Sequence, residues 1–179
     1  MKKFLLSLAC LVGFVACSDG DLQIETIDFN SVSAESCDSP VTTATTLLFK
    51  INDEEALILE LQTGVLNNGV VGETVSTEST IPSQSSLTYR IFSDGISSSY
   101  FCDDIPPATP VVVEEIEAQD GSVIVETVAL DTINFTHTIS LSGISFVNEA
   151  GERITNLAVD EFGEVTTAIP VVEETEASN

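Results

Sequence analysis

The clearest pattern in the chain is a strict alternation of apolar and polar positions from Ile133 to Leu141. A period of two residues over this length is typical of a β-strand with one buried and one wet face. After Gly143 the apolar positions fall at Ile144 and Phe146, so the phase of the alternation shifts by one residue. We therefore predict one long strand with a β-bulge near Gly143.

Short turn motifs divide the rest of the chain into further strands. Asp-Gly pairs, which tolerate the positive φ angles of tight turns, occur at Asp94-Gly95 and Asp120-Gly121 and predict two hairpins. Asn52–Glu54 predicts a third hairpin, and Asn148–Gly151 predicts a turn after the long strand. Residues 54–61 are read as a strand, although their Leu, Ala and Glu content leaves a helix as the alternative.

About eight short strands separated by turns predict an all-β protein, specifically a single antiparallel β-sandwich over residues 22–165. Barrel-like closure of the sheet is the alternative. Pro106-Pro107 and Pro110 predict a stiff, extended connector. Residues 166–179 are rich in acidic and small side chains and predict a flexible tail.

The N-terminal sixteen residues have the pattern of a secretory signal peptide. Lys2 and Lys3 precede an apolar run from Phe4 to Phe14, and the small residue Ala16 closes the segment. A run of about eleven residues makes roughly 16 Å of helix, which is shorter than the hydrocarbon core of a bilayer. We therefore expect residues 1–16 to be removed during export rather than to span a membrane.

Cys17 follows this segment directly, and the arrangement resembles the lipobox of bacterial lipoproteins, with Phe14 in the place where Leu is commonest. The resemblance implies that Cys17 is acylated and becomes the first residue of the mature chain; a free cysteine after cleavage is the alternative. Residues 18–21 resemble the acidic tether of surface lipoproteins in Bacteroidota, including uncharacterised flavobacterial ones. That resemblance implies an outer-membrane anchor with the protein facing the cell surface, a periplasm-facing anchor being the alternative.

The composition is strongly acidic, with 29 Asp and Glu against five Lys and Arg, and a formal net charge of −24. Loss of Lys2 and Lys3 with the signal peptide would leave Lys50, Arg90 and Arg153 as the basic residues. Nucleic-acid binding needs a basic footprint, so we exclude this class of partner. We find no calcium-loop motif, and we predict neither a bound metal nor another cofactor.

Cysteine usage points to one disulfide. After signal removal and acylation of Cys17, Cys37 and Cys102 form an even pair in an oxidising compartment. Two free thiols or a metal pair are the alternatives, but a Cys/His zinc site is implausible in a chain with one histidine.

Candidate chemistry is sparse, and we predict no enzyme. His137, the single histidine, lies on the apolar face of the long strand and is read as a core residue rather than a general base. Tyr89, Tyr100 and Phe101 are read as packing residues rather than a binding patch. Thr132, in Asp131-Thr132-Ile133, resembles the acceptor for O-glycosylation in exported Bacteroidota proteins.

Taken together, these features predict a lipid-anchored envelope protein that acts as a non-catalytic binding or interaction module at the outer membrane. A structural accessory subunit of an outer-membrane assembly is one alternative, and an envelope hydrolase is another.

Overall fold

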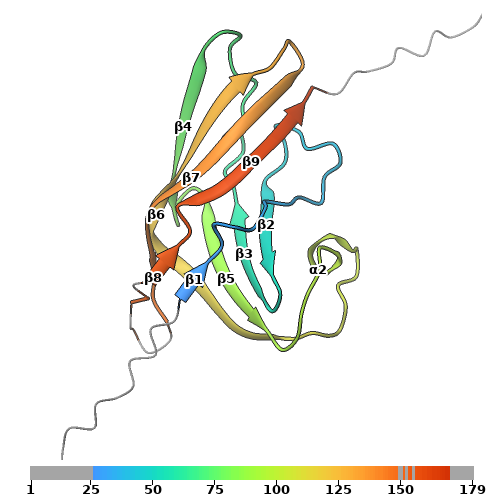
Figure 1. Ribbon diagram of the computed structural model, residues 1–179, viewed down its shortest axis with the longest axis vertical. Coiled ribbons are helices and arrows are strands. Elements are labelled where there is room, and N and C mark those ends of the chain that lie inside the picture. Colours follow the sequence, from blue (N-terminus) through green and yellow to red (C-terminus); the bar gives the residue numbers. More distant parts are fainter. Residues whose placement is uncertain (1–25, 149–150, 152, 155, 170–179) are drawn as a thin grey trace, which may run out of the picture.

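The computed structural model describes residues 26–148, 151, 153–154 and 156–169. These residues form an almost entirely β structure with one short helical turn (Figure 1). The sequence-based prediction of an all-β fold is therefore confirmed. The elements are β1 (Thr26–Asp28), β2 (Leu47–Asn52), β3 (Glu55–Glu60), β4 (Thr74–Ile81), β5 (Ser86–Phe92), α2 (Ser99–Cys102), β6 (Val112–Ala129), β7 (Asn134–Phe146), β8 (Asn156–Ala158) and β9 (Glu161–Ala168).

One large antiparallel sheet dominates the fold, in the order β2-β3-β5-β6-β7-β9, with β4 also paired to β6. The long β6 pairs with β5 along its first part and with β4 along its second part, so it passes from one half of the sheet to the other. The sheet curls into a half-barrel, and its two halves enclose the core in the manner of a sandwich (Figure 1). A small parallel sheet of β1 and β8 lies beside it.

The bend in β6 is made by paired irregularities in β6 and β7. Asp120 pairs with Ser145 and Ser122 pairs with Ser142, so Gly143 and Ile144 face the single residue Gly121. Gly121 has φ +131°, a backbone conformation that residues with a Cβ atom rarely adopt. The predicted bulge near Gly143 is confirmed. The hairpin predicted at Asp120-Gly121 is wrong, because β4 and β7 hold this segment inside the sheet on both edges.

Of the two other predicted hairpins, one is confirmed and one is wrong in part. The β2–β3 hairpin is confirmed, with Asn52 opposite Glu55 and Asp53 at φ 58°, and residues 55–60 are a strand rather than a helix. The hairpin predicted at Asp94-Gly95 is wrong in its second half: β5 precedes it, but residues 99–102 form the helical turn α2. Aromatic side chains of this turn pack on the outside of the sheet, a contact that a strand continuing from Gly95 would not provide.

The C-terminal strand extends further than the sequence pattern indicated. β9 runs to Ala168, and Thr167 is fully buried, whereas we expected a flexible tail from residue 166. Its pairing with β7, from Asn134 opposite Ala168 onward, accounts for the extension. Residues 170–179 of the predicted tail lie outside the described residues.

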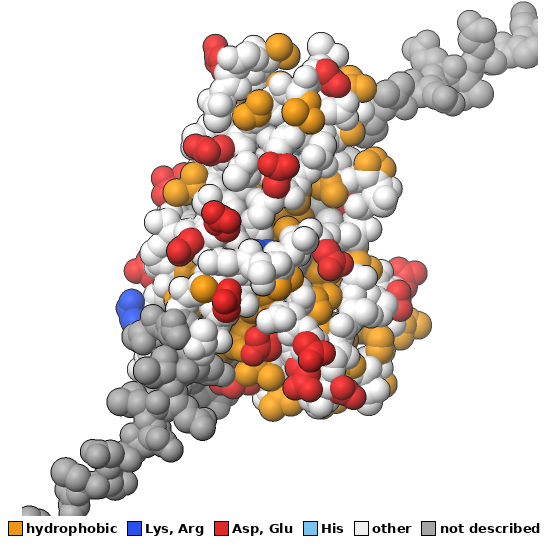
Figure 2. All heavy atoms as spheres, in the orientation of Figure 1, with side chains coloured by type: hydrophobic (Ala, Val, Ile, Leu, Met, Phe, Trp, Pro, Cys, Tyr) orange, Lys and Arg blue, Asp and Glu red, His pale blue; other side chains and the backbone are white. Residues whose placement is uncertain are grey.

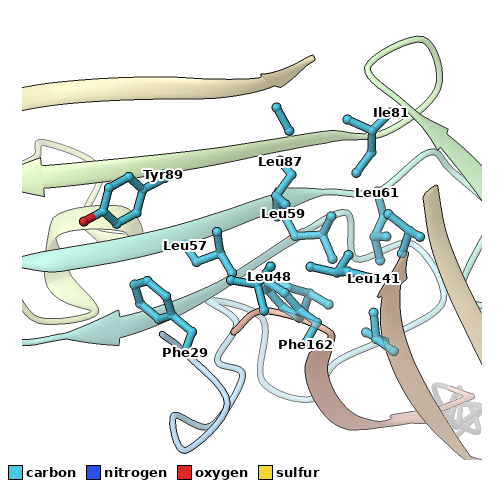
Figure 3. Close-up of a cluster of buried hydrophobic side chains, with 14 of the residues drawn as sticks. Phe29, Leu48, Leu57, Leu59, Leu61, Ile81, Leu87, Tyr89, Leu141 and Phe162 are labelled. Carbon is cyan, nitrogen blue, oxygen red and sulfur yellow. The ribbon is translucent and has the colours of Figure 1, made fainter. Parts of the chain in front are cut away.

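The main core fills the space between the two halves of the curled sheet. Leu57, Leu59 and Leu87 point inward from β3 and β5, and they meet Leu141 and Phe162 from β7 and β9 (Figure 3). Alternate residues on each strand supply these side chains, as the period of a strand requires. Among the described residues, no helix is long and apolar enough to cross a membrane.

Candidate functional site

His137 lies in the middle of β7 and is completely buried. Its Nδ1 is 2.9 Å from Oγ1 of Thr127 on β6, and its Nε2 is 2.8 Å from Oγ1 of Thr167 on β9. Burial lowers the pKa of His137, so the neutral ring is favoured. Both ring nitrogens are engaged by hydroxyl groups inside the sheet, which confirms the interpretation of a core histidine.

Lys50 is a buried polar residue that the sequence analysis did not single out. Its side chain is 1% exposed, and Nζ donates hydrogen bonds to the backbone oxygens of Phe29 (2.7 Å) and Glu161 (2.8 Å). The ammonium group also lies 5.5 Å from the centre of the Phe162 ring. Burial lowers the pKa of Lys50, while the charges of Glu161 and Asp28 oppose the shift. Only one feature of the sequence indicated this burial: Lys50 lies two residues after Leu48 and therefore on the same face of β2.

The aromatic residues that we considered for a binding patch are packed inside the protein or against its sheet. Tyr89 is buried in the main core, and its hydroxyl donates to Oε1 of Glu55 at 2.8 Å. Phe101 stacks on Phe49 with ring centres 4.6 Å apart, and Tyr100 meets the ring of Phe92 at 4.8 Å. The packing interpretation is confirmed.

The disulfide between Cys37 and Cys102 is present, with Cα atoms 5.2 Å apart. Both residues are exposed, and the bridge joins the segment before β2 to the end of α2. Cys17, the predicted lipidation site, lies outside the described residues.

Thr132 is exposed in the loop between β6 and β7. The neighbouring carboxylate of Asp131 accepts hydrogen bonds from the side chain of Asn134 (2.9 Å) and from the backbone amides of Ile133 (2.8 Å) and Asn134 (2.7 Å). These bonds, the side-chain bond first, lower the pKa of Asp131. The loop thus presents the Thr132 hydroxyl on an ordered turn, which is compatible with modification.

Exposed aliphatic side chains gather where β6 ends and β7 begins. Thr74 pairs with Val128 across β4 and β6, Leu130 donates its backbone N–H to Asn134, and Ile169 donates to Ile133. We call this region the loop end; its exposed aliphatic residues are Val70, Val71, Val128, Leu130, Ile133 and Ile169.

A shallow hollow of about 310 Å³ lies between the segment before β2 and the β3–β4 loop, at the start of β2. Thr43, Thr63 and Asn68 line it together with Leu66, and no charged side chain contributes to it. The surface is acidic, and Figure 2 shows Asp and Glu side chains scattered over the whole visible face, including its upper end. Exposed aliphatic side chains occur away from the loop end as well, at Ile105, Val111, Val112 and Val113.

Within the described ranges, no three or more His, Cys, Asp or Glu residues come together in a way that would hold a metal ion. Comparison of the chain with known protein families, with curated proteins and with solved structures gave no match.

Proposed function

We propose that the protein is a lipid-anchored envelope protein whose loop end is its interaction surface. The observation that carries this proposal is the separation of the two ends of the molecule. The described chain starts at Thr26 in the lower part of Figure 1, and the loop end lies at the top. From Phe146 to Phe135, β7 covers eleven residue steps, or roughly 35 Å at the rise of a strand.

An anchor at Cys17 would therefore leave the loop end directed away from the membrane. Six of the ten exposed large hydrophobic side chains among the described residues lie at this end, and exposed apolar surface commonly marks contact sites. Attachment to the outer membrane, facing outward, is the localisation we propose, with a periplasm-facing anchor as the alternative.

A structural accessory subunit is the second candidate, and the open edge of β4 favours it. In the described part of the chain β4 pairs only with β6, so its other edge is open to a partner strand except at Thr80, whose backbone groups are bonded to Gln84 and Ser85. The hydrolase alternative finds no support in His137, because that side chain is buried.

The anchor is tested by measuring the intact mass of the protein from envelope fractions, together with protease shaving of whole cells. We expect a mature N-terminus at acylated Cys17 and loss of the protein on shaving. A Cys17→Ser variant should appear unacylated in the soluble fraction. An unacylated wild-type protein would refute the anchor, and an acylated protein that resists shaving would place it on the periplasmic side.

The interaction surface is tested separately by a photo-crosslinking amino acid in place of Leu130, in the cells that make the protein. The matched control carries the same group in place of Ile105, which is 84% exposed but lies on the connector after α2. We expect a discrete crosslinked product from position 130 alone. Equal products from both positions, or none from either, would count against the loop end.

We also propose that Thr132 is O-glycosylated. The support is its exposure and its resemblance to the Asp-Thr-apolar acceptor. A Thr132→Ala variant from the native host should lose mass corresponding to a glycan, whereas Thr136→Ala should not. A mass difference no larger than that of the Thr→Ala substitution itself would refute the modification.

A further inference from the structure

The half of the sheet formed by β2, β3 and β5 is apolar on both faces. Leu48 and Leu57 face the main core, whereas the alternate positions Phe49 and Ile58 belong to a separate buried cluster with Phe92. Because successive side chains of a strand point to opposite faces, this second cluster lies on the outside of the sheet. Something other than the main core must therefore shield it from water.

Residues 96–111, which we call the cover, provide that shield. The cover contains α2, and the rings of Tyr100 and Phe101 contact Phe92 and Phe49 in the outer cluster. Both rings remain partly exposed, and α2 contributes no fully buried side chain. Figure 1 shows α2 in a loop that stands to one side of β2 and β3 rather than inside the sheet.

The cover is hydrogen-bonded to the sheet only at its two ends, as far as the described residues show. At the start, the Ile96 amide donates to Asp53 O at 3.0 Å. At the finish, the Val111 amide donates to Ser93 Oγ at 3.1 Å, and Val111 O accepts from the Ser93 amide at 2.9 Å. The backbone hydrogen bonds of α2 itself are local, for example from Tyr100 N to Ser97 O.

The middle of the cover has one covalent tie, the Cys37–Cys102 disulfide. Cys37 is itself held near the sheet, because Glu35 exchanges backbone hydrogen bonds of 2.7 and 3.0 Å with Phe49 on the free edge of β2. The disulfide therefore links the last residue of α2 to a segment that is fixed on β2. It keeps Tyr100 and Phe101 against the outer cluster by removing most of the freedom of the loop that carries them.

We propose that this disulfide is a redox-sensitive latch on the cover. Both cysteine residues are exposed, which places the bridge at the surface of the protein, where a dithiol reductant can approach it. One thiolate of the reductant attacks one sulfur, the Cys37–Cys102 bond breaks, and the other cysteine leaves as a thiolate. The second thiolate of the reductant then resolves the mixed disulfide. Two electrons pass to the protein, which ends with two thiols, and the reductant ends as a disulfide.

Breaking the latch opens the cover locally and leaves the main core closed. In the reduced protein only two partly exposed rings hold residues 97–110 over Phe49, Ile58 and Phe92. Segments with few buried contacts open at low free energy and independently of the core. The main core lies on the opposite face of the same strands and makes no use of the cover. The reduced form thus presents an aromatic surface that the oxidised form hides.

Hydrogen exchange of the full chain, before and after treatment with dithiothreitol, tests this latch. We expect amides of residues 97–110 to exchange about tenfold faster or more after reduction, while those of residues 122–141 change by less than about twofold. Binding of an apolar fluorescent dye should rise in parallel. Unchanged exchange in the cover would refute the latch, and equal acceleration in both regions would show that the disulfide acts only as a global staple.

Two variants sharpen the result. Cys37→Ser combined with Cys102→Ser should reproduce the exchange of the reduced protein and no longer respond to dithiothreitol. If that variant does not fold, reduction of the folded wild-type protein decides the question alone. Phe101→Ala with the disulfide intact should affect exchange of the cover little, but should accelerate it further once the protein is reduced. Equal effects of Phe101→Ala in the two redox states would contradict the latch.

Discussion

His137 is held neutral by its surroundings, and it contributes to the acid sensitivity of the protein. The ring is fully buried between the hydroxyls of Thr127 and Thr167, and its pKa lies below the ordinary value because of desolvation. Protonation is therefore easier in the unfolded chain, where the pKa is about 6.5. The contribution of the neutral ring to stability is full above that pH and is lost as the pH falls below it.

We expect the free energy of unfolding to fall by up to about 1.4 kcal/mol per pH unit between pH 6.5 and the folded-state pKa because of His137. Urea unfolding at pH 7.5 and 5.0 measures the loss, and His137→Gln, which does not titrate, should show a smaller one. Because the chain has a single histidine, its ring resonances also report the folded pKa directly. A folded pKa above 6.5, or equal acid losses in both proteins, would contradict this account.

Lys50 shows how a buried charge can serve as a structural tie. Its ammonium group joins backbone oxygens next to β1 and at the start of β9 to the middle of β2. Lys50→Met would keep much of the side-chain volume but leave the oxygens of Phe29 and Glu161 without this donor. The Phe29 oxygen would keep its hydrogen bond from the Val32 amide, but two charge-assisted hydrogen bonds would be lost, and we expect a loss of about 2–4 kcal/mol in the free energy of unfolding.

Arg153→Met is the matched control for this change, because Arg153 is exposed. It removes the same formal charge, and we expect its effect to stay within about 0.5 kcal/mol. Chemical denaturation of both variants at neutral pH provides the comparison. Similar losses in the two variants would mean that net charge, rather than the buried hydrogen bonds, governs the effect.

At the scale of the elements, local patterns predicted strands better than they predicted turns. The alternation from Ile133 to Leu141 identified β7, and the phase shift identified its bulge, because both depend on which side chains face the core. The Asp120-Gly121 pair was misread, since a positive φ at Gly121 serves a bulge as readily as a turn. The neighbouring strands that decide between the two are distant in sequence.

At the candidate sites, too, features set by local sequence could be predicted and features set by distant neighbours could not. The Cys37–Cys102 bridge followed from counting cysteines, and the packed state of His137 followed from its face of the strand. The aliphatic loop end could not be anticipated, because it brings together residues near positions 70, 130 and 169 that only the sheet register makes neighbours. The buried role of Lys50 depends on carbonyl oxygens from two distant segments, which leave no mark in the local pattern.

Gly121 tests whether the paired bulges set the curvature of the sheet. A Cβ at this position would lie 2.7 Å from Cδ1 of Ile144 and 3.0 Å from the Ser142 oxygen, with φ at +131°. We expect Gly121→Ala to lower the free energy of unfolding by about 2 kcal/mol or more, through the clash and the strained backbone together. Thermal and urea unfolding measure the change.

Gly72→Ala is the comparison that separates strain from crowding. Gly72 also has a positive φ, +85°, but a Cβ there would meet nothing within 4 Å. Gly72→Ala should lower the free energy of unfolding by about 1 kcal/mol, which is the cost of placing a residue with a Cβ atom at a positive φ. Equal losses of stability in the two variants would mean that backbone strain alone, and not the close approach of β6 and β7, explains the need for glycine at position 121.

At the scale of the whole molecule, the large negative net charge lowers the stability of the folded state. The formal net charge is −24, and of the described basic residues Lys50 is buried while Arg90 forms an ion pair with Glu115. Repulsion among the many surface carboxylates is therefore largely uncompensated, and folding brings these carboxylates closer together than they are in the unfolded chain. Salt screens such interactions, since the Debye length falls from about 30 Å at 0.01 M to about 8 Å at 0.15 M.

We therefore expect the unfolding temperature to rise by roughly 3–6 °C when NaCl is increased from about 0.01 M to 0.15 M, where most of the screening occurs. The single ion pair among the described side chains would lose strength over the same range, so Arg90→Gln, which removes it, should show an equal or larger rise. Scanning calorimetry at both salt concentrations measures the effect. A fall in the unfolding temperature with salt would mean that attractive pairs outweigh repulsion. A rise that appears only at molar salt would point to hydrophobic burial, because screening is already nearly complete at 0.15 M.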